Sequence, residues 1–376
     1  MYSYLRPIVS NAEKFSKHFN LLNLSNLAIL AFRRCNTSSV DNMAPLKIGT
    51  HNGHFHCDEV LACYLLKLLP EYKDAKIERT RDQNILDTCD IVVDVGSEYD
   101  PKIHRYDHHM REFNESISTV INKPGYTCTM KLSSAGLIYC HFGHRIIKQL
   151  VPEIQDADDI ERIFKRVYDM FIKEIDGIDN GIPMFEGEPL YRVHTDISSR
   201  VGRLNLQWNS VHLKEEDQFQ KAMALVGKEF TYFVEVTACT WLPARVLVKQ
   251  SIQNRFEVDP SGKIVELIKS VPWKEHLYDV EKELGIENEI KFVIFKDNNY
   301  RVQGIPQQLG SFICRVFLPE PWRGKRDDDL SSLSGIKDCV FVHSSGFIGG
   351  NNTKEGTLAM ARYALKFGEV DDISSY

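Results

Sequence analysis

The chain has 376 residues, a formal net charge of −6, and 43% hydrophobic and 26% charged residues. This composition is that of a folded globular protein and excludes wholesale disorder, and the length indicates two domains. No segment approaches the roughly 18 uninterrupted apolar residues of a membrane span, so we expect no contact with a membrane. The negative charge argues against non-specific coating of nucleic acid, but it is compatible with an active site built from carboxylates.

Residues 1–43 differ in composition from the rest of the chain. They hold five basic residues against two acidic ones, namely Arg6, Lys14, Lys17, Arg33 and Arg34 against Glu13 and Asp41. A basic, acid-poor leader is typical of a mitochondrial presequence and predicts import into the matrix. The alternatives are a disordered tail or an upstream extension before an internal start at Met43.

From Leu46 onward the pattern predicts a compact α/β domain over residues 44–238. Strands are expected at 46–50, 77–80 and 91–95, and helices at 59–69, 134–150, 160–176 and 219–236. Strands that alternate with helices predict a mainly parallel sheet flanked by helices. Ligands of such sheets bind beyond the carboxyl ends of the strands, where the polar clusters described below are placed.

The second part of the chain, residues 239–376, is expected to be a smaller α+β domain. Trp241-Leu242-Pro243 interrupts the helical pattern and places the domain boundary nearby. The expected elements are hairpins at 255–268 and 290–305, a strand at 339–343, a glycine loop at 344–352 and a helix at 354–367.

Six of the thirteen histidines lie in two short windows, residues 51–56 and 104–109. Asp58 accompanies the first window and Asp107 the second, while Asp94 ends an apolar strand, where an unpaired carboxylate would be costly to bury. A single one of these histidines would more often be a surface or core residue. Together, the two windows and Asp94 predict a metal site.

Imidazole and carboxylate ligands in this number exceed one tetrahedral zinc site and suit two octahedral ions. Mn²⁺ is the expected metal, with Mg²⁺ as its competitor. Two such cations can clamp a phosphate, activate water as the nucleophile and stabilise the leaving oxygen. The chemistry predicted is therefore the hydrolysis of a phosphoester.

These residues resemble the motifs of the DHH phosphoesterase superfamily. Asp107-His108-His109 corresponds to the name-giving triplet, and Asp94 to the aspartate of the preceding strand. In the first motif of the superfamily, a histidine is followed by two aspartates spaced one apart. Here His51 and Asp58 fit the outer positions, but His56 stands where the first aspartate is expected, which removes one negative charge.

A closer resemblance, to the melanocyte proliferating gene 1 family of exonucleases, extends from Lys47 to Phe367. It rests on ordered motifs: 49–53 (GTHNG), 55–59 (FHCDE), 106–109 (YDHH), 179–181 (DNG), 241–245 (WLPAR), 321–324 (PWRG) and 345–350 (SGFIGG). The family implies 3′-to-5′ exonuclease activity on RNA, in mitochondria and in the nucleus and nucleolus. It also implies a C-terminal domain that resembles the DHH-associated domain.

Carried over by motif, the resemblance implies two metal ions that share one carboxylate. His51, His56 and Asp94 would hold one ion. Asp58, Asp94 and His108 would hold the other, so that Asp94 bridges the two ions.

Three further residues near these motifs receive roles from the resemblance. His109 would donate a hydrogen bond to a phosphoryl oxygen or to the leaving group, and Asp107 would orient an imidazole. The superfamily needs one more carboxylate, and Asp179 in Asp179-Asn180-Gly181 is preferred for it, with Asp176 as the rival.

The C-terminal domain is expected to bind the substrate. Its glycine loop could cradle a phosphate with backbone N–H groups. The candidate contacts are His343, Gly346, Gly349, Gly350, Arg323 and Lys354.

Three functions follow from these residues. The first is a two-metal 3′-to-5′ exonuclease acting on RNA or short single-stranded oligonucleotides. The second is a pyrophosphatase or a hydrolase of small phosphoesters or dinucleotides, and the third is a silent metal-binding regulatory protein. Only one expected ligand, at His56, departs from the superfamily pattern, and this favours an active enzyme.

Overall fold

The computed structural model describes residues 45–373, with side chains up to residue 367. The predicted presequence of residues 1–43 lies outside this range. Within residues 45–373, none of the helices combines the length and the apolar character that a membrane span requires.

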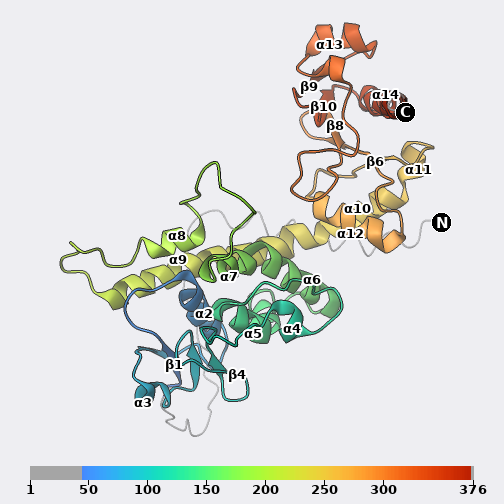
Figure 1. Cartoon of the computed structure of the whole chain (residues 1–376). Helices are drawn as coiled ribbons and strands as arrows, with labels where there is room; N and C mark the ends of the chain where they lie inside the picture. Colours follow the sequence, from blue (N-terminus) through green and yellow to red (C-terminus); the bar gives the residue numbers. More distant parts are fainter. Residues whose placement is uncertain (1–44, 374–376) are drawn as a thin grey trace, which may run out of the picture. The chain divides into compact units, whose positions relative to one another are not determined.

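The first sheet contains the strands labelled β1 and β4 in Figure 1. Its five strands have the order β2-β1-β3-β5-β4. The strands are β1 (Lys47–Thr50), β2 (Lys76–Arg79), β3 (Ile91–Val93), β4 (Tyr99–Asp100) and β5 (Arg105–Tyr106). Strand β1 pairs in parallel with β2 and β3, and β3 pairs in parallel with β5; β4 is the antiparallel strand. The mainly parallel sheet predicted from the sequence is therefore confirmed.

Helix α2 (Cys57–Lys67) follows β1 and packs against α5 (Ser134–Leu150) and α9 (Glu215–Val236). Apolar side chains of all three helices belong to one buried core. A Cβ atom on Gly227 of α9 would lie 2.2 Å from the ring of Tyr64, so glycine permits the close approach of α9 to α2. Short helices complete this part of the chain: α3 (Gln83–Leu86), α4 (Ile117–Ile121) and α8 (Ile197–Gly202).

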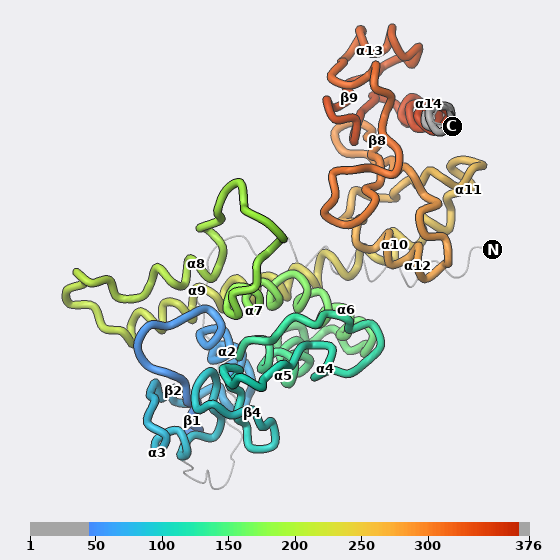
Figure 2. The backbone as a smooth tube through the Cα atoms, viewed as in Figure 1, coloured from blue at the N-terminus to red at the C-terminus, as the bar shows by residue number. Residues whose placement is uncertain are grey.

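The helix expected to end at Asp176 extends one turn further. Helix α6 (Ala157–Val167) continues through a π-helical turn, η1 (Tyr168–Ile172), into α7 (Lys173–Asp179) (Figure 2). The apolar spacing over residues 160–176 predicts a helix with a single α-helical period. The π-turn at 168–172 changes that period locally. Asp179 is consequently the last residue of the helix rather than part of a loop after it.

The helix break expected at Trp241-Leu242-Pro243 was wrong. Helix α9 runs through a second π-helical turn, η2 (Thr237–Trp241), into α10 (Leu242–Gln253). The wider turn directly before Pro243 accommodates a residue that has no backbone N–H to donate. The domain boundary at residues 238–239 thus falls inside a helical run, and the division into domains stays a prediction.

The second sheet has the order β6-β7-β8-β10-β9 and is mostly antiparallel, with β6 parallel to β7. Its strands are β6 (Ile264–Glu266), β7 (Phe292–Lys296), β8 (Tyr300–Gly304), β9 (Cys339–Val342) and β10 (Ile348–Asn351). The helices around it are α11 (Arg255–Val258), α12 (Lys274–Leu284), η3 (Glu320–Trp322), α13 (Asp327–Ser334) and α14 (Lys354–Ile373). The sheet has hydrophobic cores of its own.

The hairpin at 255–268 and the extent of the glycine loop were predicted wrongly. The hairpin at 290–305, the strand at 339–343 and the helix at 354–367 are confirmed. The predicted hairpin at 290–305 is the β7/β8 pair. The hairpin at 255–268 is instead helix α11 followed by β6, whose partner is β7. The glycine loop is shorter than expected, because residues 348–351 form β10 between β8 and β9.

Candidate metal centre

Three adjacent parallel strands direct the predicted ligands to one edge of the first sheet. His51 follows β1, Asp94 follows β3, and the triplet at 107–109 follows β5. Carboxyl ends of parallel strands meet at the same edge, so residues far apart in sequence converge there. They border a cavity of about 840 Å³, whose polar lining includes His51, His54, His56, Asp58, Arg81, Asp94, Asp107, His109 and Asp179.

Asp94 lies at the centre of this cluster with its two oxygens turned to different histidines. Its Oδ2 is 3.3 Å from Nε2 of His51, and its Oδ1 is 3.2 Å from Nε2 of His108. The backbone at Asp94 is left-handed, with φ of 59°, a conformation that few non-glycine residues adopt and that aspartate tolerates better than most. Burial alone would raise the pKa of Asp94, but hydrogen bonds from His108 and His51 hold it well below its usual range.

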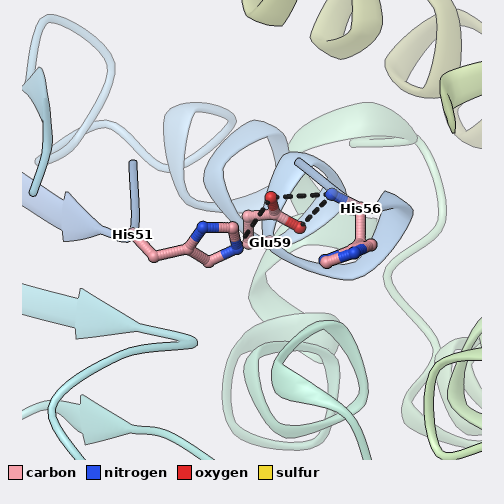
Figure 3. A group of neighbouring side chains, drawn as sticks. All are labelled: His51, His56 and Glu59. Atoms are coloured by element: carbon pink, nitrogen blue, oxygen red, sulfur yellow. Dashed lines mark hydrogen bonds and ion pairs between the residues drawn. The ribbon is translucent and has the colours of Figure 1, made fainter. Parts of the chain in front are cut away.

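His51 forms one half of the cluster with Glu59 and Asp94. Its Nε2 lies 3.1 Å from Oε1 of Glu59 (Figure 3). Its Nδ1 lies 3.1 Å from the carbonyl oxygen of Asn52. Burial lowers the pKa of His51, but the hydrogen bonds to Asp94 and Glu59 outweigh this effect and raise it to about 10. The metal-free ring is therefore an imidazolium at neutral pH.

His108 forms the other half with Asp179 and Asp58. Its Nε2 is 3.1 Å from Oδ2 of Asp179 and 3.9 Å from Oδ2 of Asp58. Burial opposes protonation of this ring too, yet hydrogen bonds to Asp179 and Asp94 raise its pKa to about 9. In both halves, the positive charge of an imidazolium neutralises the carboxylates. A bound metal ion would neutralise the same carboxylates in its place.

Asp58 gives the clearest sign that the cluster suits cations. It is 1% exposed, and neither of its oxygens accepts a hydrogen bond from any residue in the described part of the chain. Burial raises its pKa well above the usual range, and the negative charges of Asp94, Asp179 and Glu59 raise it further. Buried carboxylates in this number need compensating charge, and imidazole with carboxylate oxygen is a suitable ligand set for divalent cations.

Asp107 fixes the loop that carries both histidines of the triplet. Its Oδ1 accepts hydrogen bonds from the backbone N–H of His108 at 2.7 Å and from Nδ1 of His109 at 2.7 Å, and its Oδ2 accepts from the N–H of Ser97 at 2.6 Å. The hydrogen bond to Asp107 raises the pKa of His109, whose exposed ring lines the cavity. This geometry fits the predicted orienting role of Asp107.

The two rival carboxylates of α7 face different partners. Asp179 lies beside His108, in one of the groups of side chains that could hold an ion. Asp176 accepts hydrogen bonds from the N–H and Oγ of Ser133 at 2.9 and 2.7 Å, at the start of α5. Burial raises the pKa of Asp176 to about 7. The geometry brings Asp179 to the cluster and directs Asp176 toward a helix cap.

His56 and Glu59 differ from the expectation for the first motif. His56 is exposed at the start of α2, and its backbone N–H donates to both oxygens of Glu59 at 2.8 and 3.0 Å. Its side chain still lies close enough to share an ion with His51 and Glu59, since their ligand atoms are within 4.8 Å of one another. Glu59 was not predicted as a ligand, because a glutamate at the third position of a helix is ordinarily an exposed cap.

Cys57 and Arg81 complete the description of the cavity. Burial raises the pKa of the Cys57 thiol to about 12, so the thiol stays protonated and unreactive at neutral pH. Arg81 was not predicted as a site residue, yet its side chain lines the cavity. It donates a hydrogen bond to Oδ1 of Asn52 at 2.9 Å and another to the carbonyl of the same residue.

The six predicted substrate contacts lie around the second sheet, and none is among the residues that line the cavity within the described range. Among the side chains, His343 forms a hydrogen bond with Ser345, Arg323 donates to the carbonyl of Leu318, and Lys354 pairs with Glu266. Among the glycines, Gly346 has a positive φ of 74°, and Gly349 and Gly350 are buried in β10. These contacts are local, and the role of the six residues in substrate binding stays a prediction.

The fold and the cluster together define an α/β protein with a buried histidine–carboxylate centre suited to divalent cations. The family model MYG1_exonuc, described as an uncharacterised protein family (UPF0160), matches residues 47–365. The chain belongs to this family, which confirms the family resemblance found in its motifs.

Relatives from distant eukaryotes align over most of their own length. The chain is 52% identical to the MYG1 exonuclease of Homo sapiens over 327 residues, covering 86% of each chain. It is 46% identical to a MYG1 protein of Caenorhabditis elegans over 333 residues, covering 87% of this chain and 97% of the relative. It is 40% identical to a MYG1 protein of Saccharomyces cerevisiae over 330 residues, covering 85% and 95%.

Proposed function

We propose that the protein is a divalent-cation-dependent phosphodiesterase that removes nucleotides from the 3′ end of RNA or short single-stranded oligonucleotides. One observation carries this proposal. The two oxygens of Asp94 face His51 and His108 separately, which divides the cluster into two halves with a shared carboxylate. The name of the human relative, MYG1 exonuclease, supports a nucleic-acid substrate.

The residues of each half are suited to hold one cation. As the resemblance implies, His51, His56 and Asp94 would bind the first ion, and His51 lies 3.3 Å from Asp94. Asp58, Asp94, His108 and Asp179 would bind the second ion. Imidazole and carboxylate ligands favour Mn²⁺, with Mg²⁺ as the competitor. When bound, two such cations would clamp the scissile phosphate, activate the attacking water and stabilise the leaving oxygen.

Two polar side chains of the cavity would act on the substrate itself. Because Asp107 holds Nδ1 of His109, Nε2 is the nitrogen left to donate a hydrogen bond to a phosphoryl oxygen or the leaving group. Arg81 is placed to contact a phosphate at the rim of the same cavity. The residues around the second sheet, His343 and Arg323 among them, would hold more distant parts of the strand.

We place this activity in the mitochondrial matrix and in the nucleus and nucleolus. The composition of residues 1–43 supports the first location. The family resemblance supports the nuclear pool. Fractionation of cells that express a tagged protein tests both locations, and a purely cytosolic pool would contradict them.

The experiment that tests the activity is the cleavage of 3′-labelled and 5′-labelled short RNA by metal-stripped protein. Mn²⁺, Mg²⁺ or neither is restored before the RNA is added. We expect the 5′-labelled strand to shorten stepwise and the 3′ label to be released as mononucleotide, in both cases only with metal. Cleavage of pyrophosphate or dinucleotides but not of RNA would instead assign a small phosphoester as substrate.

A further inference from the structure

Glu59 is a buried carboxylate within the cluster for which neither motif of the resemblance provides a role. It is 0% exposed, and its Oε1 lies 3.1 Å from Nε2 of His51. Figure 3 shows its carboxylate between His51 and the backbone nitrogen of His56. A side chain that only caps a helix does not need to be buried beside two other carboxylates, Asp58 and Asp94.

The local helix geometry explains why two consecutive acids can serve two halves of one site. Asp58 and Glu59 are the second and third residues of α2, and successive residues of a helix point about 100° apart. Asp58 therefore faces His108, while Glu59 faces His51. Each half of the cluster receives one carboxylate from the same helical turn.

We infer that Glu59 is a direct ligand of the cation beside His51 and supplies the carboxylate that the first motif lacks at His56. This inference rests on the proposed two-cation function. Neighbouring ligands of one octahedral ion at roughly 2.1 Å lie about 3 Å apart. Nε2 of His51 lies at 3.1 Å from Glu59 and 3.3 Å from Asp94, which matches this spacing.

The hydrogen bond on the other side of His51 agrees with this assignment. Its Nδ1 faces the carbonyl oxygen of Asn52 at 3.1 Å, and such a contact fixes the tautomer in which Nε2 carries the metal-binding lone pair. The charge of the site agrees as well. A histidine at position 56 removes one negative charge from the motif, and Glu59 restores it within the same helical turn.

The test compares Mn²⁺ binding by metal-stripped wild-type protein and by the Glu59→Gln variant, using isothermal titration calorimetry. Glutamine keeps an oxygen that can accept the hydrogen bond from the N–H of His56, so the helix cap is retained while the charge is lost. Glu355→Gln, in the first turn of α14, is the matched control because Glu355 is exposed and does not line the cavity. Melting of each metal-free variant establishes that it is folded.

We expect the wild type and Glu355→Gln to bind two Mn²⁺ ions, and Glu59→Gln to keep one and bind the other at least about 10-fold more weakly. Shortening the side chain in Glu59→Asp should give an intermediate affinity. If folded Glu59→Gln binds both ions with wild-type affinity, Glu59 is only a cap, and the proposed function stands without this inference. If the wild type itself fails to bind two ions, the two-cation function falls and this inference with it.

Discussion

The two sheets of the protein treat buried charge in opposite ways. At the carboxyl ends of the first sheet, Asp58, Glu59 and Asp94 are buried together, and the cationic groups beside them are imidazoles. Beside the second sheet, the buried carboxylate of Glu281 meets the guanidinium of Arg315, with Nη1 to Oε1 at 2.7 Å and Nη2 to Oε2 at 2.7 Å.

The difference separates a site from a scaffold. A bidentate arginine hydrogen-bonds both oxygens of a carboxylate and neutralises its charge without an added ion. A histidine partner faces a carboxylate with a single ring nitrogen. That nitrogen can lose its proton and bind a metal ion instead. The cluster of the first sheet is therefore suited to bind a cation, whereas the ion pair of the second sheet contributes to the stability of the fold.

The largest effect is expected from Asp94→Asn, which removes the charge shared by the two halves. We expect turnover of RNA to fall by at least about 1,000-fold, because the variant loses the carboxylate that both cations need. Steady-state kinetics at saturating Mn²⁺ measures this. Asp100→Asn in β4, outside the cavity lining, should retain activity within about twofold. Near-normal turnover in Asp94→Asn would contradict the two-cation scheme.

The next largest effect lies at the second sheet. Glu281→Gln leaves the Arg315 guanidinium buried without its counter-charge, and we expect the free energy of unfolding to drop by about 3–5 kcal/mol. Denaturant titration measures the free energy of unfolding. We expect the Mn²⁺ stoichiometry of this variant to be that of the wild type. Glu283→Gln, on the same helix but in partly exposed pairs with Arg245 and Lys249, should cost no more than about 1 kcal/mol. Equal losses of unfolding free energy in the two variants would show that the buried Glu281–Arg315 pair does not stabilise the fold more than an exposed pair does.

A smaller effect, and one confined to the first sheet, concerns pH. The pKa values of about 10 for His51 and about 9 for His108 mean that both rings are protonated at pH 7 in the metal-free protein. A cation must displace these protons, so Mn²⁺ affinity should rise by about tenfold per pH unit, up to about pH 10 at the half with His51 and about pH 9 at the half with His108. Calorimetry in buffers of different ionisation enthalpy should show about two protons released at pH 7.5. Binding without proton release would contradict the assignment of these histidines as ligands.

The smallest effect is expected at Lys354. Its Nζ lies 2.6 Å from Oε2 of Glu266, and both side chains are partly exposed. Lys354→Ala should therefore change the free energy of unfolding by no more than about 1 kcal/mol. A rise in KM for RNA with unchanged stability would show that this lysine binds substrate, and would extend the site to the second sheet.

The first sheet and the convergence of most of the candidate ligands could be predicted because their signals are local. The β-branched run before Asp94 predicted a buried strand, and the pattern at 134–150 predicted helix α5. Histidines concentrated in two windows predicted a metal site, and the parallel order of the strands brings those windows together. Each signal depends on a few adjacent residues and not on tertiary packing, which is why the folded chain agrees with it.

The features that were missed depend on tertiary packing. Glu59 has the sequence position of an exposed cap, and only the contact with His51 reveals its burial in the cluster. Gly349 and Gly350 suggested a loop, but β10 needs them because a Cβ atom at Gly349 would come within 2.9 Å of Leu318. Pro243 suggested a helix end, and the π-turn before it allows the helix to continue. Propensity alone decides none of these cases.

The central claim is that Asp94 is shared by two cations, one beside His51 and one beside His108. Anomalous scattering from crystals of the Mn²⁺-loaded protein tests it most directly. We predict two manganese peaks, each within ligand distance of one oxygen of Asp94, with Glu59 at the first and Asp179 at the second. A single peak, or two peaks that Asp94 does not join, would contradict it.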